Sequence, residues 1–160
     1  MASTLQFDQW QNASGVNYNA VLQVVHTLKS DSFSTTSGSY VDVTGLSVTI
    51  TPKFATSKIL IMVNVPGGRT GTGGDAFVRL MRNGATPVGN GTYGAFGSYA
   101  GQYGLETKMS TRFYLDSPAT TSPTTYNVQT LTAGDTIFIG TRRLGDFIVG
   151  CDITVMEIAQ

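Results

Sequence analysis

The sequence has few of the side chains on which enzymes and nucleic-acid-binding proteins depend. Its 160 residues include one histidine and one cysteine, and only 12% of them are charged, with ten basic residues balancing ten acidic ones. One histidine cannot supply a Ser/His/Asp or Cys/His catalytic set, and one cysteine cannot form an internal disulfide. Zero net charge provides no long-range field that would gather nucleic acid or an anionic membrane, so we expect neither as a partner.

Long apolar runs and metal-binding patterns are also missing. No run of 18 consecutive apolar residues occurs, which excludes a membrane-spanning helix. Residues 1–19 contain neither the basic leader nor the apolar core of a secretory signal, so we expect synthesis in the cytoplasm without a signal peptide. The acidic residues are scattered singly rather than grouped as in a calcium loop or a carboxylate pair. We therefore expect no enzyme, no catalytic residue, no cofactor and no metal.

What the sequence does have is alternation of apolar and polar residues with a period of two, which indicates β-strands. Helical spacing is hard to find. Counting shorter pieces near Tyr40 and Ile148, the pattern predicts roughly eight to ten strands, at the spacing of a sandwich, jelly roll or barrel. The fold class expected is all-β. The clearest runs cover residues 20–29, 45–52, 58–65, 75–82, 108–118, 124–141 and 151–160.

Several of these runs allow the two faces of the strand to be assigned. The run 45–52 should bury Leu46, Val48 and Ile50, and Pro52 should end it because proline cannot donate to a ladder. Asn83-Gly84 suits a tight hairpin turn. In the run 20–29, Val24 and Leu28 flank His26, which predicts a hydrogen-bonded histidine in the core or at an interface, while a shared metal or pH-sensing site remains a remote alternative.

The run KILIMV, residues 58–63, is apolar on both faces, whereas a strand of a two-layer domain usually shows one face to water. Similar two-sided runs occur at 137–139, 147–149 and 153–158, and Cys151 lies beside the last of them, as a buried and inert thiol would. If such strands lie side by side, their outer face needs a cover. Sister copies in a closed oligomer can supply it; the alternative is that loops or the N-terminal segment fold back over it. The expected interface residues are Leu60, Met62, Phe138, Met156 and Ile158.

Composition divides the chain into an arm, residues 1–19, and a domain, residues 20–160, hereafter the head. The arm is polar and irregular but contains Leu5, Phe7 and Trp10, which predicts that it docks onto something. A glycine-rich loop over 89–104 carries exposed-looking aromatic rings that could stack on sugars or on a partner, although they could equally pack against a neighbouring subunit. These candidate recognition residues are Tyr93, Phe96, Tyr99 and Tyr103.

Several blocks resemble the jelly-roll head domains of bacteriophage virion surface proteins, whose heads are similar to the trimeric TNF-like fold. The blocks are VLQVVHTLKSDSFSTTSGSYVDVTGLSVTITPKFATSKILIMVNV, FVRLMRNG, FYLDSPATTSPTTYNVQT and ITVMEIAQ, in this order across residues 20–160. WQNASG in the arm resembles the segment that leads into fibre heads. In tail fibres, however, such a head ends a much longer chain, whereas about twenty residues precede it here.

The resemblance implies a non-enzymatic virion structural protein with a single TNF-like jelly-roll head. A short arm before the head is more like a homotrimeric capsid decoration (cement) protein, whose arm would dock on the capsid surface and stabilise it. The alternative is a tail-fibre head that binds a host-surface receptor or glycan. The partners implied are sister copies and the major capsid protein or other virion proteins, with a host-surface glycan as the partner in the tail-fibre alternative. The expected location is the virion.

Overall fold

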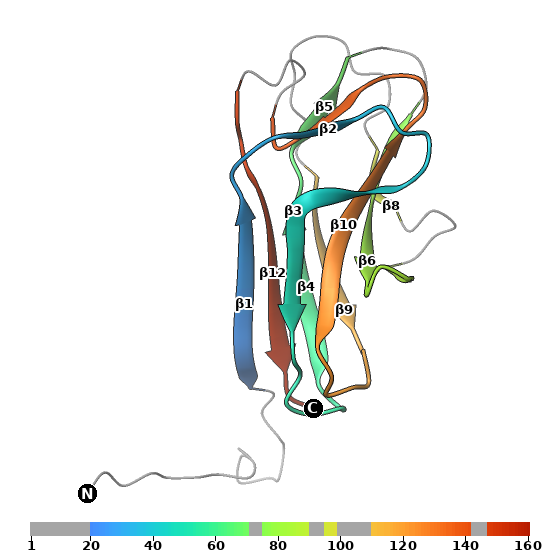
Figure 1. The fold of residues 1–160 in the computed structure, drawn as a ribbon. Coiled ribbons are helices and arrows are strands. Elements are labelled where there is room, and N and C mark those ends of the chain that lie inside the picture. The colour runs from blue at the N-terminus through green and yellow to red at the C-terminus, as the bar shows by residue number, and fades with distance from the viewer. Residues whose placement is uncertain (1–19, 71–74, 90–94, 99–109, 142–146) are drawn as a thin grey trace, which may run out of the picture.

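The fold is a sandwich of two antiparallel β-sheets, capped at one end by a third, smaller sheet (Figure 1). The structure, a computed structural model, describes residues 20–70, 75–89, 95–98, 110–141 and 147–160. These residues contain no α-helix, which confirms the all-β prediction. Their twelve strands are β1 (Val21–Lys29), β2 (Phe33–Thr35), β3 (Val41–Ile50), β4 (Lys58–Asn64), β5 (Gly67–Arg69), β6 (Ala76–Arg82), β7 (Thr86–Val88), β8 (Ala95–Ser98), β9 (Thr111–Asp116), β10 (Thr124–Thr132), β11 (Ile137–Ile139) and β12 (Cys151–Ile158).

The strand order is that of a jelly roll. One sheet has the order β1-β12-β4-β9, and the other has β3-β10-β6, extended by β7 and β8, which pair with consecutive stretches of β6. If β7 and β8 count as one interrupted edge strand, the main strands pair first with last, second with seventh, third with sixth and fourth with fifth. This nested antiparallel pairing is the double Greek key expected of the jelly roll. The sheet β2-β11-β5 lies across one end of the sandwich, at the top of Figure 1.

The core lies between the two large sheets and is built by the inward half of each alternating pattern. On β3, Leu46, Val48 and Ile50 are buried as predicted, and Pro52 follows directly after the strand. The same alternation buries every second residue of β4, β10 and β12. The sandwich therefore has a continuous apolar interior of aliphatic residues with Tyr126 among them.

Polar side chains tie the two sheets together near one end of this core. Arg82 on β6 donates two hydrogen bonds to the Asp116 carboxylate on β9, at 3.0 and 2.8 Å from the same nitrogen. The Tyr126 hydroxyl on β10 donates to the same carboxylate at 2.8 Å. Burial, reinforced by the neighbouring carboxylate, raises the pKa of Tyr126 far above its ordinary range, so it remains a donor.

The predicted hairpin turn at Asn83-Gly84 is confirmed. Both residues have positive φ, 51° and 66°, as a type I′ turn requires, and β6 pairs with β7 directly across it. The Asn83 side chain also accepts a hydrogen bond from the backbone N–H of Thr125 at 2.8 Å, which fixes the turn to the start of β10. The turn is therefore held against the outer surface of the second sheet.

Candidate functional surfaces

The outer face of the sheet β1-β12-β4-β9 carries apolar side chains on all four strands. Cross-strand pairing aligns Val24, Met156, Leu60 and Leu115 in one row, and His26, Thr154, Met62 and Phe113 in the next. Side chains on the two outer strands are largely exposed: Val24 by 53%, Leu28 by 64%, Phe113 by 64% and Leu115 by 56%. We call this surface the apolar face. Its members are Val24, Leu28, Leu60, Met62, Phe113, Leu115, Met156 and Ile158.

Four of the five residues predicted for an oligomer interface lie on the apolar face. Leu60, Met62, Met156 and Ile158 point away from the core. They are only partly exposed because β4 and β12 are neighbours in the middle of the sheet. Phe138 does not join them. Its strand, β11, pairs with β2 and β5 in the small end sheet. Of the runs that are apolar on both faces, only β4 and β12 therefore lie side by side.

The most exposed members of the apolar face, on β1 and β9, are ones that the sequence did not single out as interface residues. Phe113 and Leu115 alternate with Tyr114, whose ring packs partly against the core. In the sequence, Phe113 and Leu115 form the more apolar face of their strand, which predicts that this face packs against the core. The signal that would have found them is Tyr114, since a buried tyrosine ring can occupy a core position as well as an aliphatic residue can.

His26 also lies on this outer face, which corrects its predicted placement in the core. The side chain is exposed, and its Nδ1 lies 2.8 Å from Oγ1 of Thr154 on β12. The strand β1 thus points Val24, His26 and Leu28 outward, while Val25, Thr27 and Lys29 point toward the second sheet. An exposed histidine among the apolar side chains of this face is compatible with a place at an interface, the other alternative for His26.

Residues 147–149 do not form the two-sided strand that their composition suggested. Ile148 makes only an isolated bridge with Thr141, and Phe147, Ile148 and Val149 are exposed by 63%, 46% and 43%. The backbone turns back on Gly140 here: the N–H groups of Val149 and Gly150 both donate to the Gly140 carbonyl. The three side chains consequently face solvent instead of continuing a sheet.

Two sets of predicted residues lie outside the described residues. They are the arm residues Leu5, Phe7 and Trp10, and the loop residues Tyr93, Tyr99 and Tyr103. The backbone of Phe96 belongs to β8, which pairs with β6 at the edge of the second sheet. Docking by the arm and recognition by the aromatic loop therefore remain predictions.

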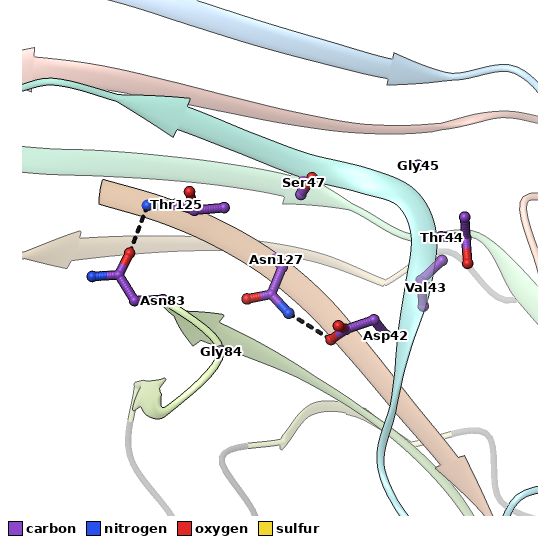
Figure 2. Close-up of a pocket in the computed structure, with 9 residues that line it drawn as sticks. All are labelled: Asp42, Val43, Thr44, Gly45, Ser47, Asn83, Gly84, Thr125 and Asn127. Carbon is purple, nitrogen blue, oxygen red and sulfur yellow. Dashed lines mark hydrogen bonds between the residues drawn. The ribbon is translucent and has the colours of Figure 1, made fainter. Parts of the chain in front are cut away.

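The outer face of the second sheet is polar, in contrast to the apolar face. Arg79 on β6 donates two hydrogen bonds to Gln129 on β10, and its guanidinium lies 3.7 Å above the ring centre of Tyr40. Gln129 in turn donates to the Asp42 carboxylate on β3 at 2.8 Å, and Asn127 donates to the same oxygen at 2.6 Å (Figure 2). A hydrogen-bonded row therefore crosses β6, β10 and β3, and it ends beside an open groove.

The described part of the chain offers little redox or metal chemistry. Cys151 is fully buried, as predicted, and burial raises the pKa of its thiol to about 12, so the thiolate is scarce at neutral pH. No group of three or more His, Cys, Asp or Glu side chains in the described ranges could hold a metal ion. Nor do these ranges include a helix long and apolar enough to cross a bilayer.

Comparison with known proteins gives a distant likeness of fold. No protein-family model matches the chain, and no curated protein matches it. Among solved structures, that of infectious bursal disease virus Gt strain has a TM-score of 0.47 at 12% identity, with 99% of this chain covered. The VP2 subviral particle of the same virus scores 0.45, also at 12% identity and with 98% covered. The chain spans 43% of the length of each of these chains, and a likeness this loose assigns no function by itself.

Proposed function

We propose that the chain is a non-enzymatic structural subunit of a virion, and that its heads associate as a homotrimer through the apolar face. The observation that carries the proposal is the apolar face itself, which is a sheet surface with four large side chains more than half exposed. Large exposed apolar side chains gathered on one face mark an interaction site more often than scattered ones do. The resemblance of residues 20–160 to phage head domains supports a place in a virion and an assembly of three copies.

The energetics favour an interface that covers the whole face. Complete burial of a Val, Leu or Phe side chain contributes roughly 1.5–3 kcal/mol, so covering the exposed parts of Val24, Leu28, Phe113 and Leu115 contributes roughly 1 kcal/mol each. Association costs about 4–15 kcal/mol in lost freedom of motion. Those four residues alone offset only the lower part of that cost. A stable assembly therefore also needs the partly exposed residues of β4 and β12.

Because the apolar face is used between the heads, we assign the contact with the capsid to the arm, residues 1–19. In this proposal Leu5, Phe7 and Trp10 dock the trimer on the outer surface of the capsid as a decoration protein that stabilises it. The runner-up role, a tail-fibre head that binds a host receptor, uses the same trimer but a different attachment. A resemblance to phage heads supports both roles.

The test of self-association is the mass of the purified chain in solution, measured by light scattering, before and after Phe113→Lys. We expect a trimer for the parent and a monomer for the variant, because a lysine ammonium is costly to bury. Phe54→Lys is the matched control, since Phe54 is 55% exposed but lies in the loop between β3 and β4. A monomeric parent in dilute buffer would overturn the proposal, as would dissociation by the control alone.

The test of capsid docking is deletion of residues 1–18. We expect the truncated chain to remain trimeric and to lose its binding to capsids in a co-sedimentation assay. Alanine replacements at Leu5, Phe7 and Trp10 together should reproduce the loss if the apolar side chains carry it. Undiminished sedimentation of the truncated trimer with capsids would remove the arm from the proposal.

A further inference from the structure

The groove beside Asp42 originates in an irregularity of the β3–β10 ladder. Ser47 on β3 pairs with Asn127, but the next paired residue on β3 is Asp42, opposite Gln129. Five steps along β3 thus match two steps along β10, so three extra residues loop out of β3. Gly45 makes this possible with a φ of 81°, a conformation that other residues rarely adopt. Bulges of this kind often interrupt pairing where a strand contributes to a site.

The bulge opens a groove on the outer face of the second sheet. Its volume is about 580 Å³, which lies within the range of small-molecule sites. Figure 2 shows the bulged part of β3 on one side, β10 along the middle, and the Asn83-Gly84 turn on the other side. The residues that line it are Asp42, Val43, Thr44, Gly45, Ser47, Asn83, Gly84, Thr125 and Asn127.

The polar groups in this groove are fixed in advance of any ligand. One oxygen of the Asp42 carboxylate accepts from both Asn127 and Gln129, which holds the carboxylate in place at the rim. The Asn127 amide oxygen points away from Asp42 (Figure 2) and is a buried acceptor that has no hydrogen-bond partner among the described residues. The Asn83 amide oxygen accepts a hydrogen bond from the Thr125 backbone N–H. The Asn83 amide nitrogen lies on the side away from Thr125 (Figure 2).

The chemistry of the lining selects among ligand classes. No Lys or Arg is among the lining residues, and Asp42 makes no ion pair with any described residue, so an anion would meet an uncompensated carboxylate. A purely apolar ligand would desolvate the carboxylate and the amides without replacing their hydrogen bonds. A neutral ligand with several hydroxyl groups can donate to Asp42 and accept from Ser47 and Asn83.

We propose that this groove is a binding site for a neutral sugar residue of a surface polysaccharide. The site lies on the sheet opposite the apolar face, so it stays open when the heads associate through that face. The described residues that line it do not belong to the aromatic loop predicted from the sequence. The inference does not rest on the proposed trimer, because all of its residues come from one chain.

The experiment is a calorimetric titration of the full-length protein with four free sugars: glucose, galactose, mannose and N-acetylglucosamine. We expect saturable binding of at least one sugar. Backbone amide shifts in NMR spectra of the same complex should be largest at Asp42, Thr44, Ser47 and Asn83. An absence of saturable binding for all four sugars would overturn the proposal, and so would shifts that cluster away from the groove.

Two variants assign the binding to the groove. Asp42→Ala should weaken binding at least tenfold, and Ser47→Trp should abolish it by filling the groove, since both side chains are exposed and lie outside the core. Asp152→Ala is the matched control, because Asp152 accepts an amide hydrogen bond from Asn64 at 3.3 Å on the opposite sheet, away from the groove. Unchanged affinity in both groove variants would overturn the proposal. The mass by light scattering, measured in parallel, reports separately on self-association.

Discussion

At the scale of single residues, the most telling position is Glu157, a buried carboxylate near the end of β12. Its side chain is fully buried, yet it accepts hydrogen bonds from the Gln23 amide at 2.6 Å and from the backbone N–H groups of Lys53 and Phe54 at 2.7 and 3.3 Å. Burial alone would raise the pKa of this carboxyl, but the donated hydrogen bonds outweigh it and hold the pKa below its ordinary value. Glu157 therefore ties β1 and the β3–β4 loop to β12.

We predict that Glu157→Gln destabilises the fold by about 1–3 kcal/mol at pH 7, because a neutral amide replaces a charged acceptor and, with its oxygen kept on the two backbone N–H groups, turns its own N–H toward the Gln23 donor. The lowered pKa sets the sign of the pH dependence. The contribution of the carboxylate is present above the unfolded-state value of 4.5 and is lost as pH falls through the lower folded-state pKa.

Urea unfolding of parent and variant at pH 7 and at pH 3 measures this effect. The difference in unfolding free energy should shrink at the lower pH. An equal difference at both values would show that packing, rather than ionisation, accounts for the loss. Gln23→Ala provides a second measurement, since it removes one donor and leaves the carboxylate in place.

Residue-level prediction from the sequence succeeded where local chemistry decides the outcome. The inward set on β3, the Asn83-Gly84 turn and the buried Cys151 were all found in this way. Glu157 was not, because a lone acid near the end of a strand usually faces solvent. Its partners come from the far end of the sequence, and only the folded chain brings them together.

At the scale of elements, β1 is the strand whose orientation the sequence obscures. Both of its faces carry apolar residues, and the more apolar one, with Val24 and Leu28, faces outward. The inward face ends in Lys29, which is buried while its ammonium reaches the exposed Asp31 carboxylate at 2.8 Å. A long lysine side chain can bury its stem in this way and still place its charge near solvent.

We predict that Val25→Asp unfolds or strongly destabilises the head, whereas Val24→Asp leaves the fold intact. Val25 packs against the core, so a carboxylate there would lose its hydration, while Val24 is 53% exposed. Thermal unfolding followed by circular dichroism compares the two variants, and they differ by one position on one strand. Both variants are made in the Phe113→Lys background, in which self-association does not contribute to Tm, and a larger loss of Tm for Val24→Asp there would mean that β1 is turned the other way round.

The bulge in β3 shows where sequence periodicity runs out. Alternation is clear only from Gly45 onward, so the run expected from the sequence began there, whereas β3 starts at Val41. The available signal was Gly45 itself, because a glycine inside a strand often marks a bulge or a close approach. The strands β2 and β5 of the small end sheet were missed for a similar reason: each has three residues, too few to show a period.

At the scale of the whole molecule, the two outer surfaces of the sandwich differ in character. One is the apolar face, and the other carries the row of hydrogen-bonded polar side chains and the groove. The sequence predicted an all-β sandwich with an apolar surface to cover. It could not predict that β1 and β9 lie at the edges of that surface, because strand order depends on contacts between segments far apart in the chain.

We predict that the thermal stability of the parent depends on its concentration. If folding is coupled to formation of a trimer, each tenfold rise in protein concentration adds roughly 0.9 kcal/mol per chain and raises Tm by roughly 2–4 °C. Calorimetry over a hundredfold range measures the shift. Phe113→Lys should abolish it, and a parent Tm that is constant over this range would argue for a stable single subunit.

The interrupted edge made by β7 and β8 bears on behaviour at high local concentration. A long, regular edge offers unpaired backbone groups to any passing chain and so invites fibril growth. Here β7 has three residues and β8 has four, and the register of β8 slips against β6. Strands this short offer few unpaired backbone N–H and C=O groups to a strand of another chain. At this edge of the second sheet, neighbouring copies can therefore lie close together with little risk of pairing strand to strand.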